Sequence, residues 1–295
     1  MPSAFNQSSS WPLWLVHGGK PLPSDHTEFA FEDLAAPIHD RVVSDVFHPR
    51  VFAYVPKEPN GRAALVLPGG GYTKLVVGKE GVEVAEWLAS LGYHAFVLVH
   101  RFPCGRFGSQ APVDDAIEAM RQIRARAAEF GLDANRIGVC GLSSGGHLAA
   151  CLVARYPADW RAPESAHAHV SHRPDFLIVG YAPISTNATG RTIIPDKPPL
   201  PPPEKQALYE AMQPDVQLLD SPPPAFIVYA ASDAVVPVEN AYRFHNALLG
   251  KGGAAELHVF AEGGHAFGLR RTKFPITEWP VLVENWLQTL GVISR

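Results

Sequence analysis

The chain has 295 residues, of which 46% are hydrophobic and 18% charged, a balance typical of a globular protein with a substantial core. Its net charge of −4 and the lack of a Lys/Arg cluster argue against a nucleic-acid partner, and its apolar runs are too short to span a bilayer. The cysteines, Cys104, Cys140 and Cys151, are too few for a disulfide framework and do not have zinc-binding spacing.

The N-terminal part of the chain, residues 1–39, is rich in Pro, Gly and polar residues and has no clear hydrophobic period. We expect it to be an extension that lies on the surface of the domain. As written, it begins without the basic start and long apolar stretch of a signal peptide, which favours a cytoplasmic protein. A chain that begins after a removed signal would look the same, so a periplasmic or secreted location stays open.

Two β-rich runs follow this extension, RVVSDVF (41–47) and RVFAYVP (50–56). They are separated by His48-Pro49, and we expect them to form an antiparallel pair of strands.

From residue 63 onward, apolar runs alternate with segments of helical period. The predicted helices cover residues 81–92, 113–131, 145–156, 238–253 and 276–291. The predicted strands are AALVLPGGG (63–71), YHAFVLVH (93–100), RIGVC (136–140), DFLIVGYA (175–182), AFIVYA (225–230) and ELHVF (256–260). This alternation predicts an α/β fold with a mostly parallel central sheet, helices on both faces and antiparallel strands on the N-terminal side.

The stretch CGLSSGGH contains two adjacent serines, after a predicted strand and before a predicted helix. A catalytic serine on a tight strand-to-helix turn needs small residues two positions before and two positions after it. Gly141 and Gly145 meet this need for Ser143, whereas a turn centred on Ser144 would put Leu142 at such a position. We therefore predict that Ser143 is a nucleophile. A phosphate-binding loop is disfavoured, because no Walker lysine follows.

The partners of this serine are predicted from the order serine, acid, histidine that hydrolases with such a turn follow. His147 comes too early for this order, so we interpret it as a structural residue beneath the turn. Asp233 follows the strand AFIVYA, and His265 follows the strand ELHVF between glycines. We predict that His265 is the general base and that Asp233 orients its imidazole.

The oxyanion of an acyl-transfer reaction needs backbone N–H donors. We expect one donor from Ser144, which follows the nucleophile, and others from Gly70 and Gly71 in the glycine-rich loop PGGGY. Tyr72 and Tyr181 lie at strand ends that face the predicted site, and we expect them to contact the substrate.

Two further features have plain structural interpretations. The stretch HAHVSHR (167–173) has three histidines but no obvious carboxylate partners, so we expect no metal site there. Arg101 could bind an anion, but an ion pair at the edge of the sheet is the favoured role.

Residues 183–224 interrupt the alternation of strands and helices with a proline-rich segment. It includes the run PDKPPLPPPEK and a short helical stretch, EKQALYEAM. Long segments of this kind within a domain are usually functional covers or disordered. We expect one catalytic domain over residues 1–295, with 183–224 as an insert near the active site.

Several of these stretches together resemble one known family. PGGGYTKLVVGKEGVEVAEWLASLGYHAFVLVHR, RIGVCGLSSGGHLAA, SDAVVPVEN and ELHVFAEGGHAFGL are similar to motifs of the acetylxylan-esterase/feruloyl-esterase-like branch of the α/β-hydrolase superfamily. The likeness covers residues 40–292. It implies an α/β-hydrolase fold, hydrolysis of short acyl esters on plant-cell-wall sugars, and no metal or organic cofactor. Ser143, Asp233 and His265 fall on the triad motifs of this family.

The function expected from the sequence is therefore a serine carboxylesterase that deacetylates xylan or xylo-oligosaccharides, with a small-molecule or oligosaccharide ester as substrate. An aminopeptidase or amidase on the same triad, and a feruloyl esterase, are the alternatives. A non-catalytic binding protein of the same fold would be expected to lose a triad residue or the glycines of the turn, and none is missing. The sequence does not indicate the oligomeric state.

Overall fold

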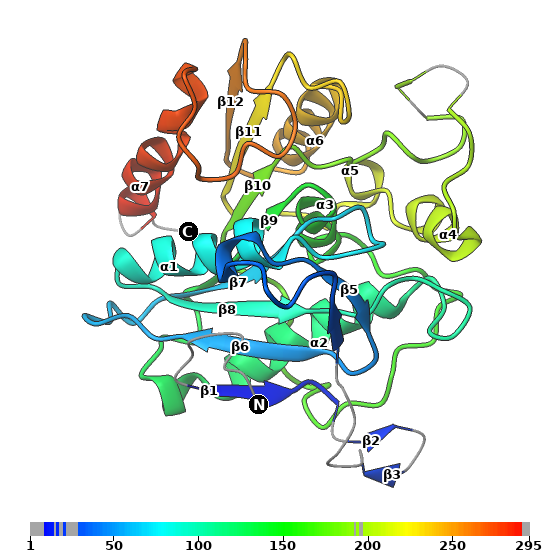
Figure 1. The fold of residues 1–295 in the computed structure, drawn as a ribbon, viewed down its shortest axis with the longest axis vertical. Coiled ribbons are helices and arrows are strands. Elements are labelled where there is room, and N and C mark those ends of the chain that lie inside the picture. Colours follow the sequence, from blue (N-terminus) through cyan, green and yellow to red (C-terminus); the bar gives the residue numbers. More distant parts are fainter. Residues whose placement is uncertain are drawn as a thin grey trace.

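The computed structural model describes residues 9–14, 16–17, 20–21, 29–191, 193–194 and 197–290. Its centre is a twisted sheet with the strand order β1-β6-β8-β7-β9-β10-β11-β12 (Figure 1). The strands are β1 (Ser9–Pro12), β6 (Arg50–Tyr54), β8 (His94–Val99), β7 (Ala63–Leu67), β9 (Ile137–Leu142), β10 (Leu177–Gly180), β11 (Ala225–Ala230) and β12 (Ala255–Phe260). Neighbours from β8 through β12 run parallel, and β6 runs antiparallel to β1 and β8. The predicted fold class is confirmed.

Helices connect these strands at the positions where the sequence shows a helical period. They are α1 (Glu83–Ser90), α2 (Ala111–Ala125), α3 (Ser144–Cys151), α4 (Pro203–Ala211), α5 (Pro214–Gln217), α6 (Glu239–Gly250) and α7 (Trp279–Thr289). Shorter helical segments are η1 (Ile38–Asp40), the π-helical turn η2 (Gly78–Val82), η3 (Ala127–Phe130) and η4 (Pro275–Glu278). The segment η3 lies within the predicted helix 113–131, η4 lies at the start of the predicted helix 276–291, and α4 and α5 lie in the proline-rich insert.

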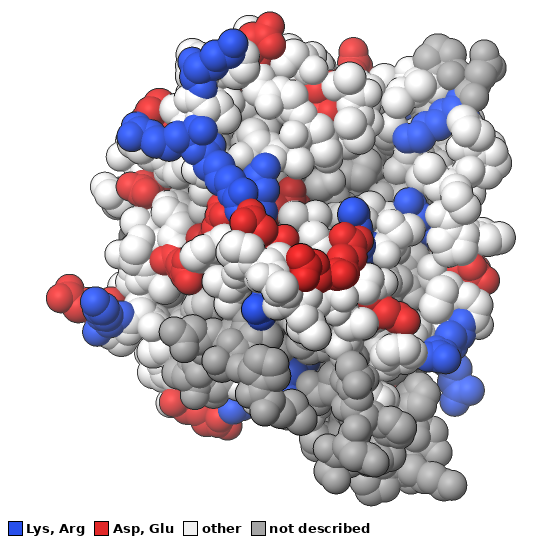
Figure 2. All heavy atoms as spheres, viewed as in Figure 1, with Lys and Arg blue, Asp and Glu red and all other residues white. Residues whose placement is uncertain are grey.

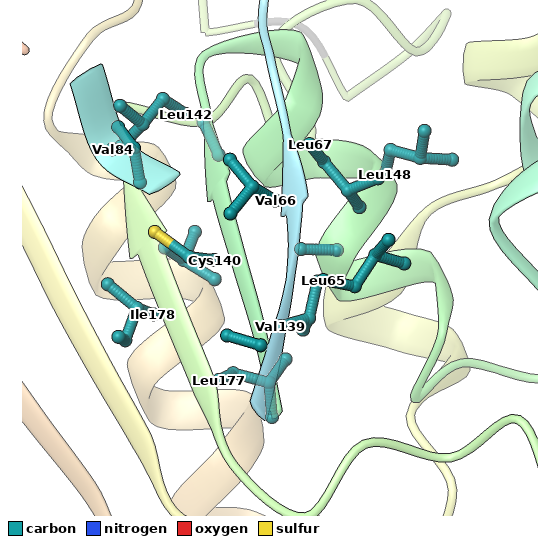
Figure 3. Packing of buried hydrophobic residues seen from close by; sticks show 14 of the residues in the cluster. Leu65, Val66, Leu67, Val84, Val139, Cys140, Leu142, Leu148, Leu177 and Ile178 are labelled. Carbon is teal, nitrogen blue, oxygen red and sulfur yellow. The ribbon is translucent and has the colours of Figure 1, made fainter. Parts of the chain in front are cut away.

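Side chains of the central strands alternate between two buried faces of the sheet. Val66 and Cys140 point to the side that carries Val84 of α1, whereas Leu65 points to the side that carries Leu148 of α3 (Figure 3). All five side chains are buried. A strand has a side-chain period of two, so a strand with helices on both faces must be apolar at every position. This explains the continuous apolar runs of the sequence.

The two β-rich runs near residue 50 do not pair with each other, so the expected hairpin is wrong. β5 (Val43–Val46) pairs with β4 (Phe29–Phe31) in a separate two-stranded sheet, while β6 joins the main sheet. The reason lies in their burial. Four of the five residues of β6 are buried, as expected for a strand inside a sheet that is covered on both faces, but only the terminal valines of β5 are buried.

Part of the N-terminal extension belongs to the main sheet, which the sequence did not predict. β1 is its edge strand, and the Trp11 ring packs against Phe96 and Phe130 at centroid distances of 5.9 Å. The indole N–H of Trp11 donates to Gln122 Oε1 on α2 at 2.8 Å. Short strands β2 (Val16–His17) and β3 (Lys20–Pro21) follow, and residues 1–8, 15, 18–19 and 22–28 of the extension lie outside the described residues. Two tryptophans, rather than a hydrophobic period, anchor this segment.

The second of these tryptophans contacts an ion pair at the end of β8. The Arg101 guanidinium donates to Asp115 Oδ1 on α2 at 2.6 Å, and Asp115 also accepts the Arg101 backbone N–H and the Trp14 indole N–H. Asp115 is completely buried. The ion-pair role predicted for Arg101 is confirmed, and this pair ties α2, β8 and the N-terminal segment together.

We expect Asp115→Ala to destabilise the fold strongly, because it leaves the Arg101 cation with most of its surface buried and without its carboxylate. Loss of one partner of a buried ion pair costs about 3–5 kcal/mol. Chemical denaturation followed by circular dichroism measures the effect. The control is Glu129→Ala, which breaks the exposed pair with Arg126 and should cost less than about 1 kcal/mol. Equal effects of the two substitutions would contradict this prediction.

Candidate active site

Ser143 lies on a sharp turn between β9 and α3. Its backbone has φ 53° and ψ −126°, a conformation that non-glycine residues rarely adopt. A Cβ on Gly145 would lie 1.9 Å from the carbonyl oxygen of Leu67, and one on Gly141 would lie 2.2 Å from the carbonyl oxygen of Gly145. The small residues predicted from the motif are therefore required by contacts between backbones.

The structure brings the three predicted triad residues together at the carboxyl ends of their strands. Ser143 Oγ lies 3.0 Å from His265 Nε2, and His265 Nδ1 lies 2.7 Å from Asp233 Oδ2. The carboxylate accepts from Nδ1–H, so Nε2 is left as the acceptor for the serine hydroxyl. The Asp233 side chain is completely buried and that of His265 is mostly buried.

Two loops hold the acid and the base. The second oxygen of Asp233 accepts the backbone N–H groups of Val235 and Val236, both at 2.8 Å, which fixes the carboxylate in the loop after β11. In the loop after β12, Ala266 directly after the base has φ 56°. His265 is thus presented by a backbone that is itself in an unusual conformation.

The glycine-rich loop after β7 packs directly against the serine turn. A Cβ on Gly69 would lie 2.6 Å from the Cβ of Ser143, so the loop can approach only as glycine. The N–H of Gly71 donates to Ser144 Oγ at 2.9 Å and is therefore already engaged. Within the described residues, the N–H groups of Gly70 and Ser144 have no protein acceptor. Of the expected oxyanion donors, these two are the available ones.

Beneath the serine turn, His147 takes part in a buried hydrogen-bond chain. Its Nε2–H donates to the carbonyl oxygen of Met212 at 3.0 Å, so its Nδ1 accepts the Tyr72 hydroxyl at 2.8 Å. Complete burial lowers the pKa of His147 to about 4, which keeps the imidazole neutral. His147 is 75 positions in sequence from Tyr72 and 65 from Met212, and it has the structural position expected for it.

The structure places both predicted substrate contacts inside the protein. Tyr72 is 1% exposed and bonded to His147, and Tyr181 is fully buried with its hydroxyl donating to Glu80 Oε1 at 3.0 Å. The ring of Tyr181 packs edge-to-face on the His265 ring, at a centroid distance of 5.1 Å. A hydroxyl on a buried ring needs a protein partner, so these tyrosines support the site from below and do not line its surface.

The proline-rich insert reaches the site through its helix α4. Tyr209 packs against the rings of Tyr72 and His147, at centroid distances of 5.6 and 4.8 Å. Lys205 lies above the glycine loop, with Nζ 3.7 Å from the point where a Cβ on Gly71 would be. The insert therefore borders the site that the three loops form.

Sequence reasoning missed one residue beside this site, the buried Glu80 in η2. It accepts the backbone N–H of Gly69 at 2.8 Å and the hydroxyl of Tyr181. A signal was present, because GKEG puts a glutamate between glycines just after a glycine-rich loop.

Outside this site, we looked for a metal centre, a basic surface and a membrane-spanning helix. No group of three His, Cys, Asp or Glu residues with metal-binding geometry occurs among the described residues. In the stretch HAHVSHR, burial and the neighbouring cations Arg121 and Arg124 lower the pKa of His172 to about 4. On the face drawn in Figure 2, basic side chains lie among acidic ones and form no broad basic surface. In the ranges that the structure covers, no helix is long and apolar enough to cross a membrane.

Known proteins similar to this chain are consistent with its fold and site. A model of the prolyl oligopeptidase family matches residues 108–289. Endo-1,4-beta-xylanase B of Butyrivibrio fibrisolvens is 30% identical over 236 residues, which are 77% of this chain and 36% of that protein. An acetylxylan esterase of Xylanibacter ruminicola is 29% identical over 77% of this chain and 45% of its own length. The chain thus spans less than half the length of these curated relatives.

Among solved structures, the acetyl ester-xyloside bifunctional hydrolase from Caldicellulosiruptor lactoaceticus is 30% identical, with a TM-score of 0.72 over 98% of both chains. This likeness extends over nearly the whole sequence, and the family model covers more than half of it. The chain therefore belongs to the prolyl oligopeptidase family of α/β-hydrolases.

Proposed function

We propose that this chain is a serine carboxylesterase that hydrolyses short acyl esters, and that its substrates are acetate esters of xylan or xylo-oligosaccharides. The observation that carries the proposal is the hydrogen-bonded series Ser143–His265–Asp233, with the serine on a strained turn. The names of similar proteins support the substrate class, since they include an acetylxylan esterase and an acetyl ester-xyloside hydrolase. We interpret the chain as one catalytic domain.

In the proposed reaction, Ser143 Oγ attacks the ester carbonyl while His265 Nε2 takes the hydroxyl proton. Asp233 holds the imidazole in the required tautomer and stabilises the imidazolium that forms. The backbone N–H groups of Gly70 and Ser144 stabilise the developing oxyanion. His265 then gives this proton to the sugar oxygen as the ester C–O bond breaks, so the sugar leaves as its alcohol and the acyl group stays on Ser143. A water molecule, deprotonated by the same imidazole, releases acetate from the acyl-enzyme.

We expect Ser143→Ala to abolish esterase turnover, with a loss of about 10⁶-fold in kcat. Ser144→Ala is the matched control, because it keeps the backbone N–H and removes only the hydroxyl that accepts the Gly71 N–H. Its activity should stay within about tenfold of the wild-type value. Initial rates with p-nitrophenyl acetate measure both. An inactive Ser144 variant beside an active Ser143 variant would contradict the assignment of the nucleophile.

We expect the enzyme to prefer acetyl over longer acyl groups, and acetylated sugar over lipid. The insert supplies a proline-stiffened wall beside the glycine loop, with Lys205 and the packed Tyr209. Proline restricts the unfolded chain, so such a wall loses little entropy on ordering. We expect a wall with polar and aromatic groups to accommodate a sugar ring better than a long alkyl chain.

The measurement is kcat/KM for p-nitrophenyl esters from acetate to decanoate, beside acetate release from acetylated xylo-oligosaccharides. An aminoacyl p-nitroanilide and a feruloyl ester serve as the competing substrates. Rates that rise with chain length, or no acetate from the sugars, would contradict the proposed specificity. Faster cleavage of the anilide would favour an amidase.

Dialysis against EDTA should leave esterase activity unchanged, because every step of the proposed reaction uses side chains and backbone N–H groups. The comparison is activity before and after dialysis, with and without added zinc. A loss that zinc restores would instead point to a metal in the reaction.

A further inference from the structure

Glu80 is a buried carboxylate beside the site, and the proposed reaction does not use it. It is 1% exposed and lies in the π-helical turn η2. Its two carboxylate oxygens have different partners: Oε2 accepts the N–H of Gly69, and Oε1 accepts the hydroxyl of Tyr181. Burial of a carboxylate costs free energy unless hydrogen bonds compensate it. The question is therefore what the two bonds of Glu80 do for the site.

The first partner leads to the oxyanion loop. Gly69 precedes Gly70, whose N–H is a proposed oxyanion donor, and it touches the nucleophile turn. A Cβ at Gly69 would lie 2.5 Å from Glu80 Oε2 and 2.6 Å from the Cβ of Ser143. The carboxylate therefore contacts the loop at the point where the loop meets the nucleophile.

The second partner leads to the base. Tyr181, with φ 37°, places its ring between the His265 ring and Phe267, at centroid distances of 5.1 and 4.4 Å. A hydrogen bond from its hydroxyl fixes this ring, and the ring in turn supports one side of the imidazole. Glu80 thus contacts the oxyanion loop directly, and it reaches the base indirectly, through the side chain of Tyr181.

The neighbouring residue contacts the base loop from the same turn. The Lys79 ammonium donates to the carbonyl oxygen of Ala266, directly after the base, and its stem lies against Gly268. Single π-helical turns occur often at functional sites. Here the turn projects two consecutive side chains toward the loops on either side of Ser143.

Close packing brings this turn so near to the site. A Cβ on Gly78 would lie 2.4 Å from the carbonyl oxygen of His39, and one on Gly81 would lie 3.1 Å from Pro68, next to the oxyanion loop. Burial raises the pKa of Glu80 above its ordinary value, and the hydrogen bonds from Gly69 and Tyr181, the nearby Lys79 and, when protonated, His265 offset part of this rise. The four groups that favour its carboxylate form are thus parts of the site or its supports.

We propose that Glu80 is a positioning residue of this esterase, and that its one side chain sets the oxyanion loop and the general base in the relative arrangement that catalysis needs. This inference rests on the proposed function. It assigns Glu80 no contact with the substrate. A positioning role should therefore change kcat and leave KM nearly unchanged.

The test is Glu80→Gln, measured with p-nitrophenyl acetate. Glutamine has nearly the same volume but only one acceptor oxygen, so it can serve one of the two donors. We expect kcat per folded enzyme to fall about 10- to 100-fold, up to the lower range for loss of an oxyanion donor, with KM within about twofold. Circular dichroism and thermal melting measure the folded fraction. The matched control is Glu86→Gln on α1, since Glu86 is exposed and, among the described residues, its side chain bonds to His39 away from the site. Its kcat should not change.

Tyr181→Phe is the second variant, and it decides the question if Glu80→Gln does not fold. It removes the hydroxyl but keeps the ring against His265, so kcat should fall several-fold at constant KM. In the double variant, the losses should be less than multiplicative, because both substitutions alter the same hydrogen-bonded pair.

Unchanged kcat in folded Glu80→Gln, or in Tyr181→Phe, would overturn the role of Glu80. A loss fully explained by a smaller folded fraction would do the same. An inactive wild-type enzyme would instead contradict the proposed function, so the two failures are distinguishable.

Discussion

The candidate site depends on one steric constraint, the contact of the serine turn with the strand beside it. β7 and β9 are parallel neighbours, and the chain leaving β9 must turn at once into α3 beneath the end of β7. The carbonyl oxygen of Leu67 occupies the space where Gly145 would carry a side chain. Within this tight turn Ser143 has a strained backbone conformation, and its hydroxyl lies within hydrogen-bond distance of His265. The parallel arrangement of the strands then brings the acid and base loops to the same edge.

Below this edge, polar side chains are buried in pairs that satisfy each other. His147 is neutral and connects the oxyanion loop to the insert, while Glu80 connects the same loop to the support of the base. Each chain of hydrogen bonds joins segments far apart in the sequence. Fully satisfied polar networks favour a single arrangement of a core, because any shift leaves a buried group without its partner. The two networks therefore make the positions of the oxyanion loop, the insert and the ring that supports the base dependent on one another.

The proline-rich insert forms one border of the candidate site. It anchors through Tyr209 and Met212 on residues that are themselves buried, and it leaves Lys205 beside the glycine loop. Because Tyr209 of α4 packs against Tyr72, the glycine-rich loop and α4 support each other. A border of this kind is compatible with the proposed substrate class, for which the names of similar proteins are the main support.

The sequence by itself determined the features that depend on neighbouring residues. Runs such as AALVL are apolar at every position, which predicts strands buried on both faces, and the spacing of Gly141 and Gly145 selects Ser143 over Ser144 because turn sterics are local. Asp233 and His265 could be chosen because each directly follows a strand of a parallel sheet.

Tertiary structure decided what depends on residues distant in the sequence. β5 and β6 look alike as strands, but their partners are set by how much of each is buried. Tyr72 and Tyr181 lie at strand ends, yet only the packing shows that they point inward, and only the fold brings Ser144 Oγ to the N–H of Gly71. Glu80 gains its two partners from segments 11 and 101 positions away. Pairing and burial are properties of the assembled chain, because the groups that satisfy a buried atom can come from any part of the sequence.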